Sequence, residues 1–211
     1  MSITEISSIE DNGIYTDLLR EFLRNDWHIS VLYGTTNKFR VIETINESSH
    51  LIPVKILKYE KSNIFRKGLA LLNFDSAYLK AINSINLTKI DLILYATPPI
   101  TLTRTISWVK SRYAAESYLL LKDIFPQNAL DMGLIKATNP LYKYFKFLEK
   151  KLYRLSDRIG CMSPANVEYV LSNNPEVIGK LEVNPNSIDI SRITAKGVNR
   201  VRILEKYGIS E

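Results

Sequence analysis

The residues best suited to chemistry are Lys122 and Asp123, which follow a short apolar run at 118–121. Such a run is typical of a central strand buried on both faces of a sheet. Ligands of open α/β sheets bind beyond the carboxyl ends of the strands, so this charged pair predicts a functional site. Asp123 could hydrogen-bond a hydroxyl group or take its proton. Alternatively, Asp123 only caps the turn and short helix that follow.

A second candidate is the turn at Asn12 and Gly13, which precedes a helix predicted over residues 14–24. A glycine at this position lets backbone N–H groups approach a ligand, and the start of a helix favours an anion. The alternative interpretation is that Gly13 only makes the turn.

Segments with strand and helix patterns alternate along the chain. Strands are predicted at 27–33, 54–59, 90–96, 118–121, 159–162 and 181–184, with a polar loop over 34–49. Helices are predicted at 14–24, at 65–82 (continuous or broken near 73–75), after Pro98 and Pro99, at 140–155 and after Ser163. This alternation predicts an α/β fold, with a mostly parallel sheet and helices on both faces.

Composition narrows the classes of partner. The net charge of +6 favours anionic partners such as phosphates, lipid surfaces or nucleic acid. Nucleic acid is the least favoured, because the chain has no zinc-finger spacing, RNP-like motif or block of Lys and Arg. His28 and His50 are too far apart to predict a metal site, and Cys161 is expected to be a buried, inert thiol. The lack of a signal peptide and of a long apolar run predicts a cytoplasmic protein.

The predicted helix at 140–155 is amphipathic, with Lys143, Phe147, Lys150 and Arg154 opposite its apolar stripe. A basic, partly aromatic face of this kind can rest on anionic lipid headgroups. That interpretation predicts peripheral contact with the inner face of the plasma membrane. The alternative is an ordinary solvated face opposite a core stripe.

Four stretches together resemble the amino-terminal domain of a glycosyltransferase family 4 enzyme, one of the two Rossmann-like halves of the GT-B fold. They are NGIYTDLLREFLRNDWHISVLY, IDLILYATPP, YLLLKDIFPQNALDMGLI, and LYRLSDRIGCMSPANVEYV followed by LEVNPNSID. The resemblance covers about residues 8–190 and is greatest to enzymes of capsule, O-antigen and exopolysaccharide assembly.

This resemblance implies that a sugar is moved, with retention of configuration, from a nucleotide-diphosphate donor to a glycan or lipid-linked acceptor. No further cofactor is implied. Gly13 matches the glycine of a loop that faces the interdomain cleft, and Asp123 matches a polar residue close to the reacting sugar and acceptor. Residues 186–189 match a hinge loop that usually reads Asn-Gly-Val-Asp, with Ser187 in place of the glycine. Asn12, Lys122 and Asn186 are therefore further candidates for substrate binding.

The sequence departs from the family pattern at both ends. The first strand is expected to be truncated, because residues 1–6 offer only a stub of it. Residues 1–190 then form the acceptor-side domain, and residues 191–211 form a linker or the start of a carboxy-terminal domain. Activity would require a separate donor-binding partner domain. The alternative is a non-catalytic truncated product, or a sugar- or phospholipid-binding module that retains the fold.

Overall fold

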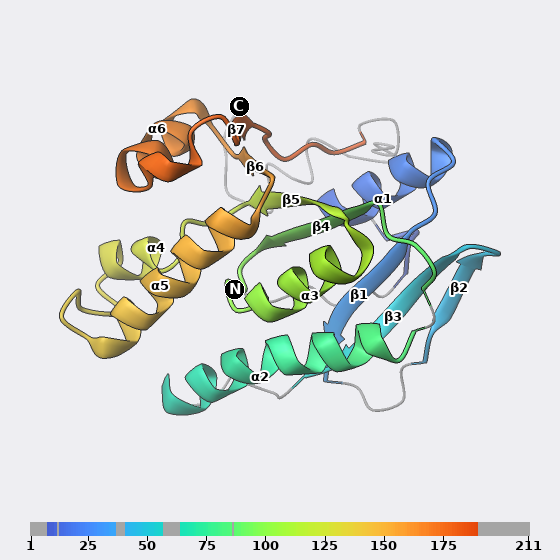
Figure 1. The fold of residues 1–211 in the computed structure, drawn as a ribbon, viewed down its shortest axis with the longest axis horizontal. Helices are drawn as coiled ribbons and strands as arrows, with labels where there is room; N and C mark the ends of the chain where they lie inside the picture. Colours follow the sequence, from blue (N-terminus) through green and yellow to red (C-terminus); the bar gives the residue numbers. More distant parts are fainter. Residues whose placement is uncertain (1–7, 12, 37–40, 57–63, 86, 190–211) are drawn as a thin grey trace, which may run out of the picture.

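A computed structural model describes residues 8–11, 13–36, 41–56, 64–85 and 87–189, with the backbone alone over 64–72 (Figure 1). The helices are α1 (Ile14–Arg24), α2 (Ile64–Asn83), α3 (Thr103–Tyr113), α4 (Gln127–Asp131), α5 (Pro140–Leu155), α6 (Pro164–Asn173) and the short 3-10 helix η1 (Pro175–Val177). The strands are β1 (Ser30–Thr35), β2 (Glu43–Asn46), β3 (Ser49–Lys55), β4 (Leu92–Thr97), β5 (Glu116–Leu121), β6 (Arg158–Cys161) and β7 (Leu181–Val183). The stub expected at 1–6, the linker expected at 191–211 and Asn12 lie outside the described residues.

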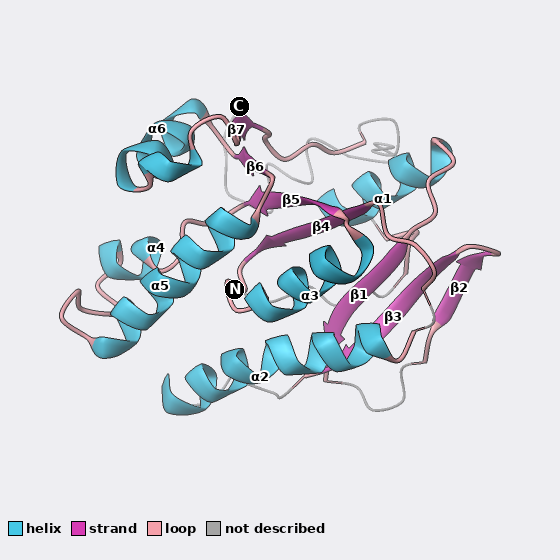
Figure 2. Cartoon of the chain, in the orientation of Figure 1, coloured by secondary structure: helices cyan, strands magenta, loops and turns pink. Residues whose placement is uncertain are grey.

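The described strands form two sheets, whose strands Figure 2 shows in magenta. One sheet has the order β4-β5-β6-β7, and all its strands are parallel. In the other, β1 is parallel to β3, and β2 pairs with β3 in the antiparallel sense. Helices flank the parallel strands and connect them, so the predicted α/β, Rossmann-like fold is confirmed.

The main core lies between the parallel sheet and helices α3, α5 and α6. Leu119 and Leu121 of β5 point into this core, where Ile159 of β6 and Leu152 of α5 are fully buried. Because side chains alternate along a strand, Leu120 faces the other side of the sheet, and it is buried as well. The sequence prediction that this strand is covered on both faces is therefore confirmed.

Several local predictions are confirmed by the contacts around α5 and α6. Pro140 is the first residue of α5, and the Asn139 side chain accepts a hydrogen bond from the Leu141 N–H at 2.8 Å. Ser163 Oγ accepts from the Asn166 N–H at 3.2 Å and so caps α6. Cys161 is fully buried, and burial raises the pKa of its thiol to about 11, as expected for an inert residue.

The prediction of a loop over 34–49 is wrong at its two ends and over residues 43–46, and residues 37–40 lie outside the described residues. Gly34 and Thr35 continue β1, and residues 43–46 form β2 in a hairpin with β3. The strand expected at 54–59 instead begins at Ser49 and ends at Lys55. Ser49 is compatible with the buried start of this strand because its hydroxyl accepts a hydrogen bond from the Ile29 N–H at 3.1 Å.

Asp75 bears on two further predictions, the continuity of α2 and the start of the helix after β4. Helix α2 passes through residues 73–75 without a break, and the Asp75 side chain is buried against the start of α3. Its Oδ2 accepts from the Arg104 N–H at 2.9 Å, and its Oδ1 accepts from the Thr105 N–H at 2.8 Å. Pro98 and Pro99 were expected to open the helix after β4, but α3 begins at Thr103, where Asp75 supplies acceptors for unpaired N–H groups.

We predict that Asp75→Ala lowers the free energy of unfolding by about 1–3 kcal/mol, because it leaves buried N–H groups of α3 without an acceptor. Asp75→Asn keeps one side-chain oxygen and should cost less. Urea unfolding of both variants measures the difference. An alanine variant as stable as the parent would show that this cap contributes little.

Candidate functional site

The carboxyl ends of β4, β5 and β6 meet at one edge of the parallel sheet. The register pairs Thr97 with Leu121, and Leu121 with Cys161. Lys122 and Asp123 therefore leave β5 at the middle of this edge. The Thr97 hydroxyl donates to the Asp123 carbonyl at 3.3 Å, which ties the backbone of Asp123 to the end of β4. This edge is where ligands of parallel α/β sheets bind.

Asp123 is half-buried at this edge. Within the described part of the chain, its carboxylate makes no hydrogen bond or ion pair. The following helix, α4, has Pro126 at its N-cap and receives no side-chain cap. The structure therefore gives the Asp123 carboxylate no capping contact, and its oxygens remain available to a ligand.

The first turn of α1 reaches the same edge. Burial raises the pKa of the Tyr15 phenol, and the nearby Asp123 carboxylate raises it further. Gly13 precedes this turn as the N-cap, in an extended conformation and without a side-chain cap. The backbone N–H groups at the beginning of α1 have no side-chain cap, and helix N-termini of this kind can bind an anion.

Lys122 brings a positive charge to this edge. The residue is half-buried, and desolvation lowers the pKa of its ammonium group. Among the described residues, no carboxylate forms an ion pair with it. A partly desolvated cation of this kind can attract phosphate oxygens. The described residues contain no group of His, Cys, Asp and Glu side chains that could hold a metal ion.

The segment after β7 lines the same edge. The Asn184 N–H donates to the Cys161 carbonyl at 2.7 Å, and the Asn184 side chain donates to the Tyr118 hydroxyl at 2.8 Å. Tyr118 in turn donates to Glu182 at 2.5 Å, and burial and this bond raise the pKa of Tyr118 to about 12. A Cβ at position 160 would lie 2.5 Å from the Tyr118 oxygen and 2.8 Å from the Asn184 Cβ, so any residue larger than glycine would displace these side chains.

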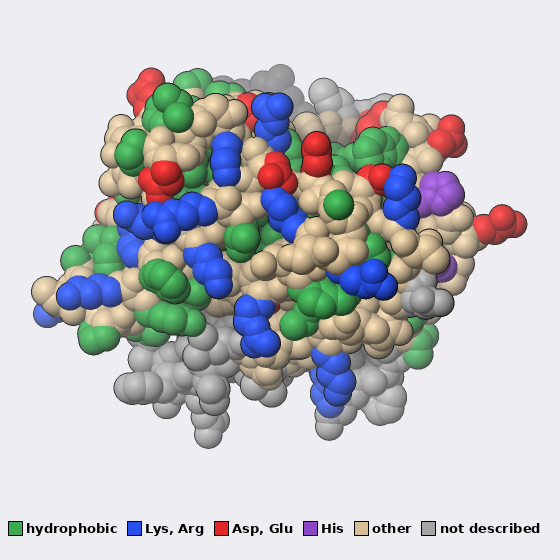
Figure 3. All heavy atoms as spheres, in the orientation of Figure 1, with side chains coloured by type: hydrophobic (Ala, Val, Ile, Leu, Met, Phe, Trp, Pro, Cys, Tyr) green, Lys and Arg blue, Asp and Glu red, His purple; other side chains and the backbone are tan. Residues whose placement is uncertain are grey.

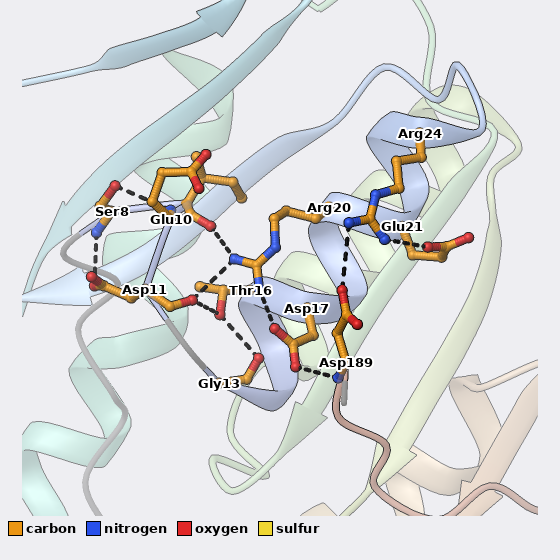
Figure 4. A network of polar contacts seen from close by, with 11 residues as sticks. Ser8, Glu10, Asp11, Gly13, Thr16, Asp17, Arg20, Glu21, Arg24 and Asp189 are labelled. Carbon is orange, nitrogen blue, oxygen red and sulfur yellow. Dashed lines mark hydrogen bonds and ion pairs between the residues drawn. The ribbon is translucent and has the colours of Figure 1, made fainter. Parts of the chain in front are cut away.

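Asp17 joins this segment to α1, as Figure 4 shows. Its Oδ2 accepts from the Asp189 N–H at 2.8 Å, and its Oδ1 pairs with the Arg20 guanidinium. Arg20 also donates to the carbonyls of Ile9 at 2.5 Å and Asp11 at 3.0 Å, which fixes the turn before α1. The same two charged side chains therefore hold both the turn and the segment that follows β7.

The structure places Lys122 and Asp123 at this edge, and the segment that contains Asn186 runs from the edge to α1. Gly13 is the N-cap of α1, two residues before Tyr15, whose pKa the Asp123 carboxylate raises. Asn186 itself is exposed. Asn12 lies outside the described residues. Lys143, Phe147, Lys150 and Arg154 are exposed on α5, where Arg154 pairs with Glu176 at 3.1 Å.

Sequence reasoning missed Tyr15, Asp17, Arg20 and Tyr118. The three-residue spacing of Asp17 and Arg20 on a helix was an available sign of an ion pair. Nothing in the local pattern indicates that Asp17 also binds Asp189, because that contact joins distant parts of the chain.

A scan against models of known protein families gives no match, and a search of curated proteins gives no significant match. Residue patterns and the geometry of this edge are therefore the observations that bear on function.

We predict that Arg20→Met lowers the free energy of unfolding by about 3 kcal/mol, because it leaves the Asp17 carboxylate, which is only 13% exposed, without its cation. The matched control is Arg24→Met on the same helix. The Arg24 side chain is 56% exposed, so solvent screens its ion pairs and their loss should cost much less than the loss of Arg20. Urea unfolding compares the two variants, and equal losses would contradict the structural role given to Arg20.

Proposed function

We propose that this chain is the acceptor-side domain of a retaining glycosyltransferase, which transfers a sugar from a nucleotide-diphosphate donor to a glycan or lipid-linked acceptor. The main support is the half-buried Asp123 carboxylate, which has no hydrogen bond or ion pair in the described part of the chain. It lies where the central strand of a parallel sheet ends, close to Tyr15 in the first turn of α1. The sequence resemblance matches the same residue to a position near the reacting groups.

The reaction requires groups that act on the acceptor. A new bond forms between an acceptor oxygen and the anomeric carbon, and the acceptor hydroxyl loses its proton. Asp123 would hydrogen-bond this hydroxyl or take its proton. The half-buried position of Asp123 would also limit competition from water.

The reaction also requires stabilisation of the leaving group. When the bond between the sugar and the diphosphate breaks, negative charge develops on the phosphate oxygens. Lys122 and the N–H groups that follow Gly13 provide positive potential at the edge where this charge would develop. The N–H groups belong to the first turn of α1 and are fixed by the helix before the donor binds, so they would need little reorganisation. The remaining donor contacts would come from a complementary donor-binding domain.

We predict that Asp123→Asn lowers the rate of sugar transfer by roughly a hundredfold to ten-thousandfold, the usual contribution of a positioned acid or base. The assay measures transfer from a nucleotide-sugar to a lipid-linked acceptor, in the presence of a complementary donor-binding domain. The control is Asp91→Asn, which removes an exposed carboxylate just before β4, at the opposite edge of the sheet.

A folded Asp123→Asn protein with normal turnover would contradict the catalytic assignment. If the parent protein binds sugar or phospholipid but the complemented parent transfers no sugar, the chain acts as a binding module. The activity of the Asp123→Asn variant therefore tests the role of Asp123. The activity of the complemented parent tests whether the chain is part of a glycosyltransferase at all.

A further inference from the structure

We propose that the protein docks on an anionic phospholipid bilayer through one defined surface, and that Met132 and Leu134 enter the headgroup region. This surface, here called the α4–α5 surface, comprises Met132, Leu134, Lys143, Tyr144, Phe147, Lys150 and Lys151. The inference is independent of the proposed sugar transfer, because it depends on the outer faces of α4 and α5 and not on the carboxyl edge of the sheet.

The outward stripe of α5 combines positive and aromatic residues. From its second turn on, the exposed residues of this helix are Lys143, Tyr144, Phe147, Lys150, Lys151 and Arg154. Spacings of three and four place them on one face, and none of them is acidic. The Phe147 side chain is 61% exposed, although the opposite face of the same helix packs in the core.

A turn that closes α4 exposes two further apolar side chains, Met132 and Leu134. The Gly133 N–H donates to the Leu130 carbonyl, and the Leu134 N–H donates to the Ala129 carbonyl, each at 2.9 Å. Gly133 has a φ of +69°, so the turn is a Schellman motif. The hydrophobic residue after the glycine commonly packs back on the helix in this motif, but Leu134 is 68% exposed.

The turn is also fixed relative to α5. Tyr142 of α5 donates to the Gln127 side chain of α4 at 3.1 Å, and Phe125 packs edge-on against Phe145 at 5.1 Å. Met132 and Leu134 are therefore held in exposed positions by an ordered hydrogen-bonded turn. Exposing these side chains to water is unfavourable, and contact with a partner would remove that cost.

Three lysines of this surface carry charge that the protein does not neutralise by direct pairing. Lys146 turns toward the buried Glu149 at 2.6 Å, and Arg154 pairs with Glu176. Lys143, Lys150 and Lys151 form no ion pair within the described part of the chain. Figure 3 shows Lys and Arg side chains together with hydrophobic side chains over α4 and α5, at the left of the view.

An anionic bilayer fits both components of this surface. Lysines bind the phosphate-bearing headgroups, while Met, Leu and Phe side chains reach the acyl boundary. The phosphates of a nucleic acid could bind the lysines, and its bases could stack on the aromatic rings. A nucleic acid offers no apolar layer for Met132 and Leu134, however. In the described part of the chain, no helix has the length and apolar character needed to span a membrane.

The first test measures binding to vesicles of phosphatidylcholine with and without phosphatidylglycerol, by co-sedimentation at low salt. The parent should bind only the anionic vesicles. Combined substitution of Lys143→Gln, Lys150→Gln and Lys151→Gln should weaken binding roughly a hundredfold, since each lysine near an anionic surface contributes on the order of 1 kcal/mol. The control combines Lys55→Gln, Lys80→Gln and Arg112→Gln, which change the net charge equally on β3, α2 and α3.

The second test examines insertion. The fluorescence contributed by the new indole in Leu134→Trp should shift to shorter wavelength on anionic vesicles. The control is Ile42→Trp, at an exposed position before β2, and its added fluorescence should not shift. Equal vesicle binding by both triple variants, or no shift for Leu134→Trp, would overturn the proposal. Binding of the parent to single-stranded RNA but not to anionic vesicles would overturn it as well.

Discussion

The candidate site depends on the Asp17 carboxylate, whose two oxygens bind segments from opposite ends of the described chain. Oδ1 pairs with Arg20, which in turn holds the carbonyls of Ile9 and Asp11, and Oδ2 accepts from the Asp189 N–H. One buried charge pair therefore fixes the turn before α1 and the segment after β7. A buried pair of this kind is costly to break, because either partner alone would be left charged and desolvated.

The parallel sheet determines which edge of the molecule carries the candidate site. Because β4 to β7 all run the same way, residues that follow each strand gather at one edge. Lys122 and Asp123 leave the middle of that edge, and the Tyr15 phenol of α1 lies within the electrostatic influence of the Asp123 carboxylate. The Asp123 carboxylate, unpaired within the described residues, and the partly desolvated Lys122 then occupy one region, which suits a substrate with both hydroxyl and phosphate groups.

The α/β fold and the position of Asp123 could be predicted from sequence because they depend on local patterns. A buried apolar run followed by charged residues marks the end of a central strand wherever the neighbouring strands lie. By contrast, the sequence left open whether α2 is broken near Asp75, and the role of Asp75 as a cap for α3 depends on a contact between separate helices. Glu149 lies within an apparently ordinary amphipathic helix but is buried, where its carboxylate contacts Lys146 and Tyr153. The partners of Asp75 and Glu149 depend on tertiary packing, and the hydrophobic periodicity of the sequence does not reveal them.

The central claim is that the first turn of α1 and the end of β5 form one site. It can be tested by measuring the pKa of Tyr15 with ¹³C-labelled tyrosine and NMR, with the signal assigned from Tyr15→Phe. Burial and the Asp123 carboxylate both raise this pKa. Asp123→Asn should therefore lower the pKa of Tyr15 while leaving it above its ordinary value, because the burial remains. An unchanged pKa of Tyr15 in a folded Asp123→Asn protein would contradict the account.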